Sequence, residues 1–168
     1  MHVRIGDILL REGRLTTHQV HEVLAAQLAT GEPFGLLCEK LFNLPTEYIE
    51  EAWQTQYIGM AQRIDPLHEM IDNRALGLIT RRQAWQFRVL PIRFDDRELM
   101  LATTSHHLRR ALRFATRCLG VPVYLVIAES RPLGEALCRH YPIAGMTPAS
   151  IDDDAMDRLL GMGRSSAA

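Results

Sequence analysis

The residues best suited to ligand recognition lie in the first third of the chain, in a motif that occurs twice. The first copy runs over residues 4–27 and the second over residues 33–56, so equivalent positions are 29 residues apart. The first copy holds an arginine, two glycines, several leucines and a glutamine. An arginine donates paired hydrogen bonds to planar acceptors, a glycine allows close approach of other groups, and a glutamine both donates and accepts. This set is typical of a binding site.

The two copies match at the positions with special backbone or packing roles and differ at several polar ones. The matched pairs are Gly6 with Gly35, Leu15 with Leu44, Thr17 with Thr46, Val20 with Ile49, and Gln27 with Gln56. The second copy has Pro33 where the first has Arg4, Glu39 where it has Leu10, and Phe42 where it has Gly13. The first copy therefore keeps the complete motif, and the second keeps part of it.

Each copy is predicted to form a short helix, a tight turn and a longer helix. In the first copy Gly13 is placed to end the short helix in the left-handed conformation. Thr16 is then a predicted N-cap that forms a capping box with Gln19. In the second copy Asn43 takes the left-handed role one position later, and 45–46 begins the next helix. Four helices within residues 1–58 would make a compact helical module.

Beyond residue 58 the hydrophobic pattern changes, and an α+β sandwich is expected over residues 59–142. Pro91 favours an edge position for the first strand. Gly120 is expected to close the helix over 107–119. Ser130 is expected to cap the last helix. The expected elements are a helix over 74–87, a strand over 88–94, a turn at 95–96, a strand over 98–103, a helix over 107–119, a strand over 121–128 and a helix over 130–140. This ββαβα order after the first helix predicts a small antiparallel sheet with helices on one side. Residues 143–168, rich in Pro, Gly, Ser, Asp and Ala, are expected to be a flexible tail, with one transient helical turn or docking segment at 155–160.

Composition excludes several classes of protein. The chain has 168 residues, 47% of them hydrophobic, which is enough to build a core, and a formal net charge of −1. That charge argues against a surface devoted to nucleic acid or anionic lipid. No window reaches eighteen apolar residues and no signal-peptide pattern is present, so a cytoplasmic protein is expected. Cys38, Cys118 and Cys138 have no metal-ligand or disulfide spacing and are expected to be small buried thiols.

No group of residues predicts catalysis or a metal site. The chain lacks the GxxxxGK[ST] loop of nucleotide hydrolases and the GxSxG motif of serine hydrolases. The pairs His18 with His21 and His106 with His107 lack further ligands at suitable spacing. We therefore expect neither an enzyme nor a metalloprotein.

A line of arginines follows the predicted helix over 107–119. Arg109, Arg113 and Arg117 lie at i, i+4 and i+8, with Arg110 beside them. One interpretation is a solvated face. The alternative is docking to an acidic partner, for which the run at 152–154 of the same chain is a candidate. RNA or DNA binding is disfavoured because the line lacks interleaved aromatic residues.

The motif resembles that of MshEN-type domains, the N-terminal regulatory domains of type II secretion and type IV pilus assembly ATPases. The resemblance rests on Arg-Ile-Gly-x-x-Leu-Leu-x-x-Gly-x-Leu at 4–15 and on a helix that ends in Leu-x-x-Gln at 24–27. Independent support comes from 72–79, 84–91, 98–102 and 119–123. The similarity covers residues 4–142 and implies an α+β regulatory domain.

The resemblance implies that the ligand is cyclic di-GMP, each motif copy holding one half of the near-symmetric dinucleotide. Guanine presents O6 and N7 as adjacent acceptors that an arginine such as Arg4 can bind, leucines could cover a purine face, and Phe34 and Trp53 could stack on guanine. The implied ligand-binding residues are Arg4, Ile5, Gly6, Leu9, Leu10, Gly13, Leu15, Gln27, Phe34, Gly35, Leu44, Trp53 and Gln56.

Two hypotheses remain. In the first, cyclic di-GMP shifts the helical module against the sandwich and regulates a protein partner in a secretion, pilus or glycosyltransferase system. In the second, the domain is a degenerate adaptor that binds no nucleotide and docks to protein. The alternative to a ligand role is structural: Gly6 would allow close packing of helices, and Arg4 would be a solvated arginine at a helix start. Neither hypothesis involves direct contact with DNA or RNA, and membrane contact would come only through the partner.

Overall fold

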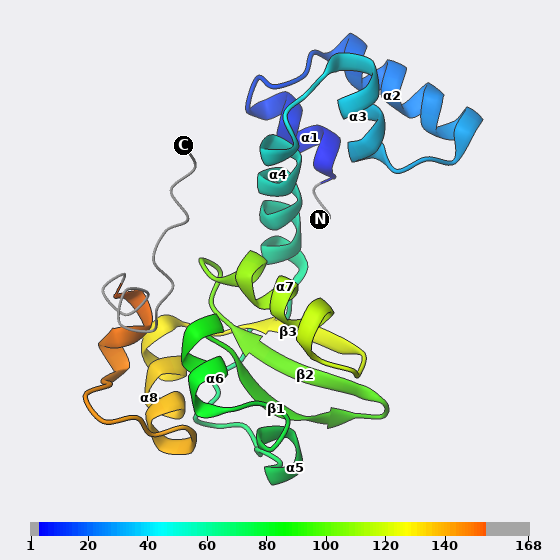
Figure 1. Ribbon diagram of the computed structural model, residues 1–168. Helices are drawn as coiled ribbons and strands as arrows, with labels where there is room; N and C mark the ends of the chain where they lie inside the picture. The colour runs from blue at the N-terminus through cyan, green and yellow to red at the C-terminus, as the bar shows by residue number, and fades with distance from the viewer. Residues whose placement is uncertain (1–3, 154–168) are drawn as a thin grey trace. The chain divides into compact units, whose positions relative to one another are not determined.

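The chain divides into two compact units, Met1–Met60 and Ala61–Ala168 (Figure 1). The computed structural model describes residues 4–153 of them. The first unit is helical and the second combines helices with a three-stranded sheet, which confirms the α+β class. The division lies two residues after the boundary we expected from the sequence at residue 58.

The first unit contains the four helices that the repeat predicted. They are α1 (Ile5–Arg11), α2 (Thr17–Thr30), α3 (Phe34–Phe42) and α4 (Thr46–Met60). The predicted capping box at the start of α2 is confirmed. The Gln19 backbone N–H donates to the Thr16 hydroxyl at 3.2 Å, and the Gln19 side-chain oxygen accepts the Thr16 N–H at 2.9 Å. These bonds satisfy two backbone groups that a helix start otherwise leaves unpaired.

The two turns use the left-handed residues that the sequence predicted. Gly13 has φ of +68° and Asn43 has φ of +50°. The turns also repeat a hydrogen bond. The Leu15 N–H donates to the Leu9 carbonyl, the Leu44 N–H donates to the Cys38 carbonyl, and both N···O distances are 3.3 Å. The left-handed residue lies one position later in the second turn than in the first. The hydrogen bond that closes each turn nevertheless joins equivalent residues of the two copies.

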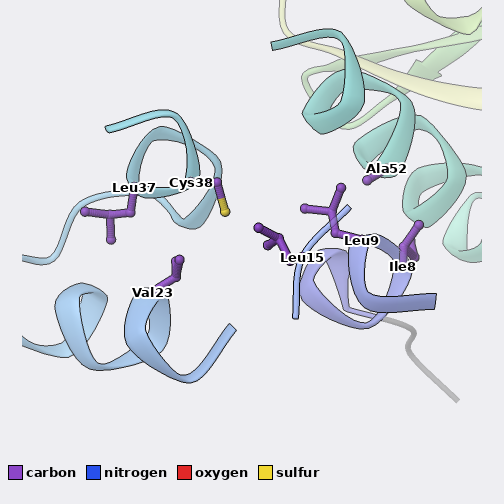
Figure 2. Close-up of a cluster of buried hydrophobic side chains, with 7 residues drawn as sticks. All are labelled: Ile8, Leu9, Leu15, Val23, Leu37, Cys38 and Ala52. Atoms are coloured by element: carbon purple, nitrogen blue, oxygen red, sulfur yellow. The ribbon is translucent and has the colours of Figure 1, made fainter. Parts of the chain in front are cut away.

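The core of the first unit is built from equivalent positions of the two copies (Figure 2). Ile8 of α1 is equivalent to Leu37 of α3, and Val23 of α2 to Ala52 of α4; all four are at most 3% exposed. Two further equivalent pairs complete it: Leu9 with Cys38, and Leu15 with the partly buried Leu44. Helix α1 packs mainly against α4, and α2 against α3. Each short helix therefore packs on the long helix of the other copy, so neither copy can bury its apolar face alone.

The sheet of the second unit has the order β1–β2–β3, with β1 (Leu90–Asp95), β2 (Glu98–Thr103) and β3 (Val123–Ile127). The predicted hairpin and the edge position of Pro91 are confirmed, since β1 is the first strand in the sheet order and is antiparallel to β2. The expectation of a fully antiparallel sheet is wrong, because β2 and β3 are parallel. Their connection is α7 (Leu108–Cys118), a helical crossover of the kind that parallel neighbours require.

The sheet is also covered on both faces, not on one. Five consecutive residues of β2, 99–103, are each at most 2% exposed. Successive residues of a strand point to opposite faces, so protein covers both sides of the central strand. Beyond β3, Arg63 forms a parallel bridge to Ile127, which extends the sheet by a segment for which no element was expected.

The predicted helix over 74–87 is two helices, α5 (Asn73–Leu76) and α6 (Arg81–Phe87). Thr80 caps α6 and forms a capping box with Gln83, so a new helix starts inside the predicted one. Helix α6 ends at Arg88, which has φ of +51°. The strand therefore begins at Leu90 and not at residue 88 as we expected.

Two helix ends also differ from the prediction. Helix α7 ends at Cys118 with Leu119 in an extended conformation, and Gly120 does not take the left-handed conformation we assigned to it. Helix α8 (Ser130–His140) has Glu129 as its N-cap. The Ser130 hydroxyl, expected to cap α8, donates instead to the Asp152 carboxylate at 2.9 Å.

The flexible tail expected from residue 143 is wrong for residues 143–153. A short 3₁₀ helix, η1 (Pro148–Asp152), packs on α8, and Ile151 is fully buried. The guanidinium of Arg88, only 1% exposed, donates to the Ile151 carbonyl at 3.2 Å and to the Gln86 carbonyl at 3.1 Å. A buried arginine needs such acceptors, so it fixes this segment to the core. The helical turn suggested at 155–160 lies outside the described residues.

Candidate functional site

Arg4 is the N-cap of α1, and its backbone is fixed while its side chain is exposed. The Arg4 carbonyl accepts from the N–H groups of Asp7 and Ile8, and the Arg4 N–H donates to the Asp7 carboxylate at 3.3 Å. Within residues 4–153 no partner holds the guanidinium. Arg4 therefore presents a cationic, hydrogen-bonding group from a rigid position, as recognition of a guanine edge requires.

Gly6 lies in a close helix contact. A Cβ atom at this position would be 3.1 Å from Cζ of Phe34 and 3.5 Å from Cγ1 of Val20. The space beside Gly6 is therefore filled by the protein itself. This supports the packing role that the sequence left open and places Gly6 and Phe34, both predicted ligand residues, against one another.

The equivalent glycine of the second copy makes the equivalent contact. A Cβ atom at Gly35 would lie 2.7 Å from Cγ2 of Ile49, and Ile49 is the counterpart of Val20. Both glycines thus let a short helix lie close to the long helix of its own copy. The contact is duplicated with the fold, independently of which polar residues each copy carries.

The leucines assigned to the purine face fall into two groups. Leu9 is fully buried and Leu15 is 4% exposed, and both belong to the core (Figure 2). Leu10 is 39% exposed and is the member of this group that offers apolar surface to a ligand. Leu9 and Leu15 can support a site only by holding α1 and the following turn in place.

The two aromatic candidates already have partners within the unit. The half-buried Phe34 packs on Gly6 and against the core. Trp53 stacks at a tilt on Tyr57, with ring centroids 5.3 Å apart. Either ring could stack on a guanine only through the ring face that these contacts leave open.

The remaining candidates are placed as follows: Ile5 and Leu44 pack partly buried against the core, Gly13 is exposed in the turn after α1, and Gln27 and Gln56 are half-buried on α2 and α4. Arg4 and Gly13 lie at opposite ends of α1, about 13 Å apart along the helix axis. The structure therefore places Phe34 against Gly6, and it places Arg4 at the start of α1, Leu10 in its last turn and Gly13 in the turn that follows.

Arg14 and Tyr48 form a contact that the sequence analysis did not predict. The Arg14 guanidinium carbon lies 3.7 Å from the centroid of the Tyr48 ring, a cation–π geometry. It joins the turn after Gly13 to α4. Neither residue repeats at the 29-residue period, and only the packing of α1 on α4 brings them together.

Cys38, a fully buried residue in the core of the first unit, is ionisable. Burial raises the pKa of the Cys38 thiol to about 11, with a smaller contribution from the nearby Glu39 carboxylate. The thiol is therefore neutral at ordinary pH and serves as a small apolar side chain. This confirms the expected buried thiol at Cys38, whereas Cys118 is exposed and Cys138 is half-buried.

Comparison with known proteins identifies the family. The MshEN domain family matches residues 57–147, which is more than half of the chain, and the chain belongs to this family. MshEN domains are regulatory domains associated with type II secretion and type IV pilus ATPases. Every candidate ligand residue precedes residue 57, so the matched segment covers the sheet-containing unit and leaves the repeat outside.

Two solved structures resemble the chain. A structure of MshE with cdg is 24% identical with a TM-score of 0.46, and covers 83% of this chain and 99% of its own. The N-terminal domain of XpsE is 17% identical with a TM-score of 0.42, and covers 84% of this chain and 99% of its own. No curated protein sequence matches the chain.

None of the helices within residues 4–153 is both long and apolar enough to cross a membrane.

Proposed function

We propose that the chain is a cytoplasmic regulatory domain that binds cyclic di-GMP through the first repeat copy and controls a secretion, pilus or exopolysaccharide machine. The observation that carries this proposal is Arg4, an exposed guanidinium on the rigid start of α1 with no partner among residues 4–153. Membership in the MshEN family and the resemblance of the motif support the choice of cyclic di-GMP as the ligand. The protein partner is a component of the machine, and the domain contacts neither DNA nor RNA.

In this proposal the first copy recognises one guanine and the second contributes little. Arg4 donates to O6 and N7 of the base, and the exposed Leu10 covers part of the purine face. The equivalent positions of the second copy are Pro33 and Glu39. Pro33 has no side-chain donor and Glu39 adds a negative charge near an anionic ligand. One bidentate pair contributes about 1–3 kcal/mol of recognition, so affinity depends strongly on Arg4.

Isothermal titration calorimetry with cyclic di-GMP tests the proposal on the full chain. Arg4→Ala should weaken binding by at least tenfold. Arg11→Ala, which removes the same charge from an exposed position of the same helix, should weaken it less than about threefold, because it removes only long-range attraction. Absence of binding by the unmodified chain, or equal losses in the two variants, contradicts the proposal.

The adaptor without a nucleotide is the second candidate, and the contacts of Gly6 and Phe34 favour it. The ring that could stack on guanine fills the space beside Gly6, and the large apolar side chains Leu28 and Leu41 are 90% and 50% exposed. These leucines are suited to protein contact. Titration that gives no heat with cyclic di-GMP, from a chain shown to be folded, would select this candidate.

A further inference from the structure

The line of arginines predicted from the sequence lies on the exposed face of α7, in the second unit. The opposite face is buried through Leu108, Ala111, Phe114 and Ala115. Arg109, Arg113 and Arg117 follow one another at intervals of four residues, about 6 Å along the axis. With His106, Arg110, Phe87, Phe114 and Cys118 they line a hollow of about 660 Å³. This arginine surface belongs to the second unit, and the repeat belongs to the first.

Four arginines line this surface: Arg109, Arg110, Arg113 and Arg117. The whole chain has a formal net charge of −1, so the excess of arginine here is balanced by acids elsewhere. Within residues 4–153 no carboxylate pairs with Arg113 or Arg117. The neighbouring His107 has its pKa lowered to about 4, first by burial and then by the charges of Arg88 and Arg110. The charges of Arg113 and Arg117 favour an anion over an additional cation at this surface.

The shape and chemistry of the surface distinguish between possible anions. Three arginines one turn apart present charge along a line of about 12 Å, which suits a row of carboxylates better than one compact phosphate. Nucleic acid is disfavoured because the two rings present, Phe87 and Phe114, stack on each other with centroids 4.4 Å apart. Phe114 is also only 2% exposed, so neither ring forms an open platform for bases. The overall negative charge opposes general attraction to anionic membranes.

We propose that the arginine surface of α7 docks a helix of a partner protein that carries acidic side chains at i, i+4 and i+8. Carboxylates at this spacing lie on one face of a helix and each can accept hydrogen bonds from one arginine of the line. Arginine is enriched at protein interfaces for this reason. The half-buried Phe87 ring lines the same hollow as the arginines and supplies apolar contact surface.

Fluorescence anisotropy with a synthetic helical peptide tests this docking on the full chain at low salt. The peptide is alanine-rich with three glutamates one turn apart, and its control has the same composition with the glutamates distributed around the helix. The ordered peptide should bind at least fivefold more tightly. The double variant Arg113→Glu/Arg117→Glu should weaken its binding by more than tenfold. The matched control is Arg131→Glu/Arg139→Glu, which makes the same charge change at exposed positions of α8 and should weaken binding less than twofold.

Several outcomes would overturn the proposal. Equal binding of both peptides, or equal losses in both double variants, would indicate general attraction only. Preferential binding to vesicles of phosphatidylglycerol or to single-stranded DNA would assign the surface to another class of partner. Binding that appears only after Asp153 and Asp154 are changed to Asn would show that the chain's own acidic run at 152–154 fills the surface. If circular dichroism shows that the Glu variant is unfolded, Arg113→Gln/Arg117→Gln replaces it, with an expected loss of at least fivefold.

Discussion

The two copies of the repeat share their interior and differ in their exposed recognition residues. Ile8 and Leu37 are buried at equivalent positions, and both copies place a glycine against a β-branched residue of the long helix. Yet Arg4 of the first copy corresponds to Pro33, and Leu10 to Glu39. The helical core needs both copies because each short helix packs on the long helix of the other. Recognition has no such requirement, so one copy can lose its ligand residues while the fold is retained.

The largest expected effect comes from removing a core residue of the first copy. Leu9→Ala should lower the free energy of unfolding by about 3 kcal/mol, because a fully buried leucine leaves a cavity. Its counterpart Cys38→Ala removes one atom and should cost only about 1 kcal/mol. Urea unfolding followed by circular dichroism measures both. Leu10→Ala, at a 39% exposed position, is the control; a cost equal to that of Leu9→Ala would contradict the core described here.

The stability of the chain should depend on pH through the buried thiol of Cys38. Because the folded-state pKa of Cys38 is raised to about 11 from an ordinary value of 9.0, folding favours the protonated thiol. The stabilisation is fully present below pH 9 and is lost as the pH rises from about 9 to 11, by about 2 kcal/mol in total. Unfolding measured from pH 8 to 11 should therefore fall more steeply in the unmodified chain than in Cys38→Ala. Parallel curves would show that the thiol is not buried in the folded state.

The next prediction concerns whether an arginine restores ligand binding by the second copy. Arg4 and Pro33 are N-caps with similar extended backbones, at φ −83° and ψ 153°, and φ −59° and ψ 142°. An arginine is therefore accommodated at position 33 without a change of fold. If the proposed nucleotide function is right, Pro33→Arg should tighten cyclic di-GMP binding by about tenfold. Pro33→Ala serves as the calorimetric control, and a gain of the same size there would show that removing proline, not adding a guanidinium, is responsible.

The smallest expected effect compares the two packing glycines. Gly35→Ala places a methyl group 2.7 Å from Ile49, and Gly6→Ala places one 3.1 Å from the Phe34 ring. The collision at Gly35 should exceed the gain in helix propensity and destabilise the chain by about 1 kcal/mol. At Gly6 the two effects should nearly cancel. Thermal unfolding of the two variants checks the order, and a more stable Gly35→Ala chain would contradict it.

Features with a local cause were predictable from the sequence. The capping box of Thr16 with Gln19 and the left-handed turns at Gly13 and Asn43 each depend on a few neighbouring residues. The period of 29 residues also indicated which apolar positions are equivalent. These signals were sufficient for the four helices of the first unit and for the β1–β2 hairpin.

Features that depend on distant residues were not predictable in this way. The ring of Phe34 fills the space beside Gly6, and Arg14 contacts Tyr48, only because of how the helices pack. The parallel pairing of β2 with β3 depends on the path of α7. For the candidate site, the sequence proposed the exposed Leu10 together with Leu9 and Leu15 and could not tell that the last two are buried.

The packing of η1 on α8 requires particular residues, and these can be looked for in the sequences of relatives. A Cβ atom at Gly134 would collide with the Pro148 carbonyl oxygen, so a side chain at position 134 would prevent η1 from packing on α8. Arg88 would then lose the Ile151 carbonyl as an acceptor. A glycine within this helix, together with an arginine before β1, is therefore a diagnostic pair. It should separate relatives that fold this segment back from relatives in which the chain continues outward.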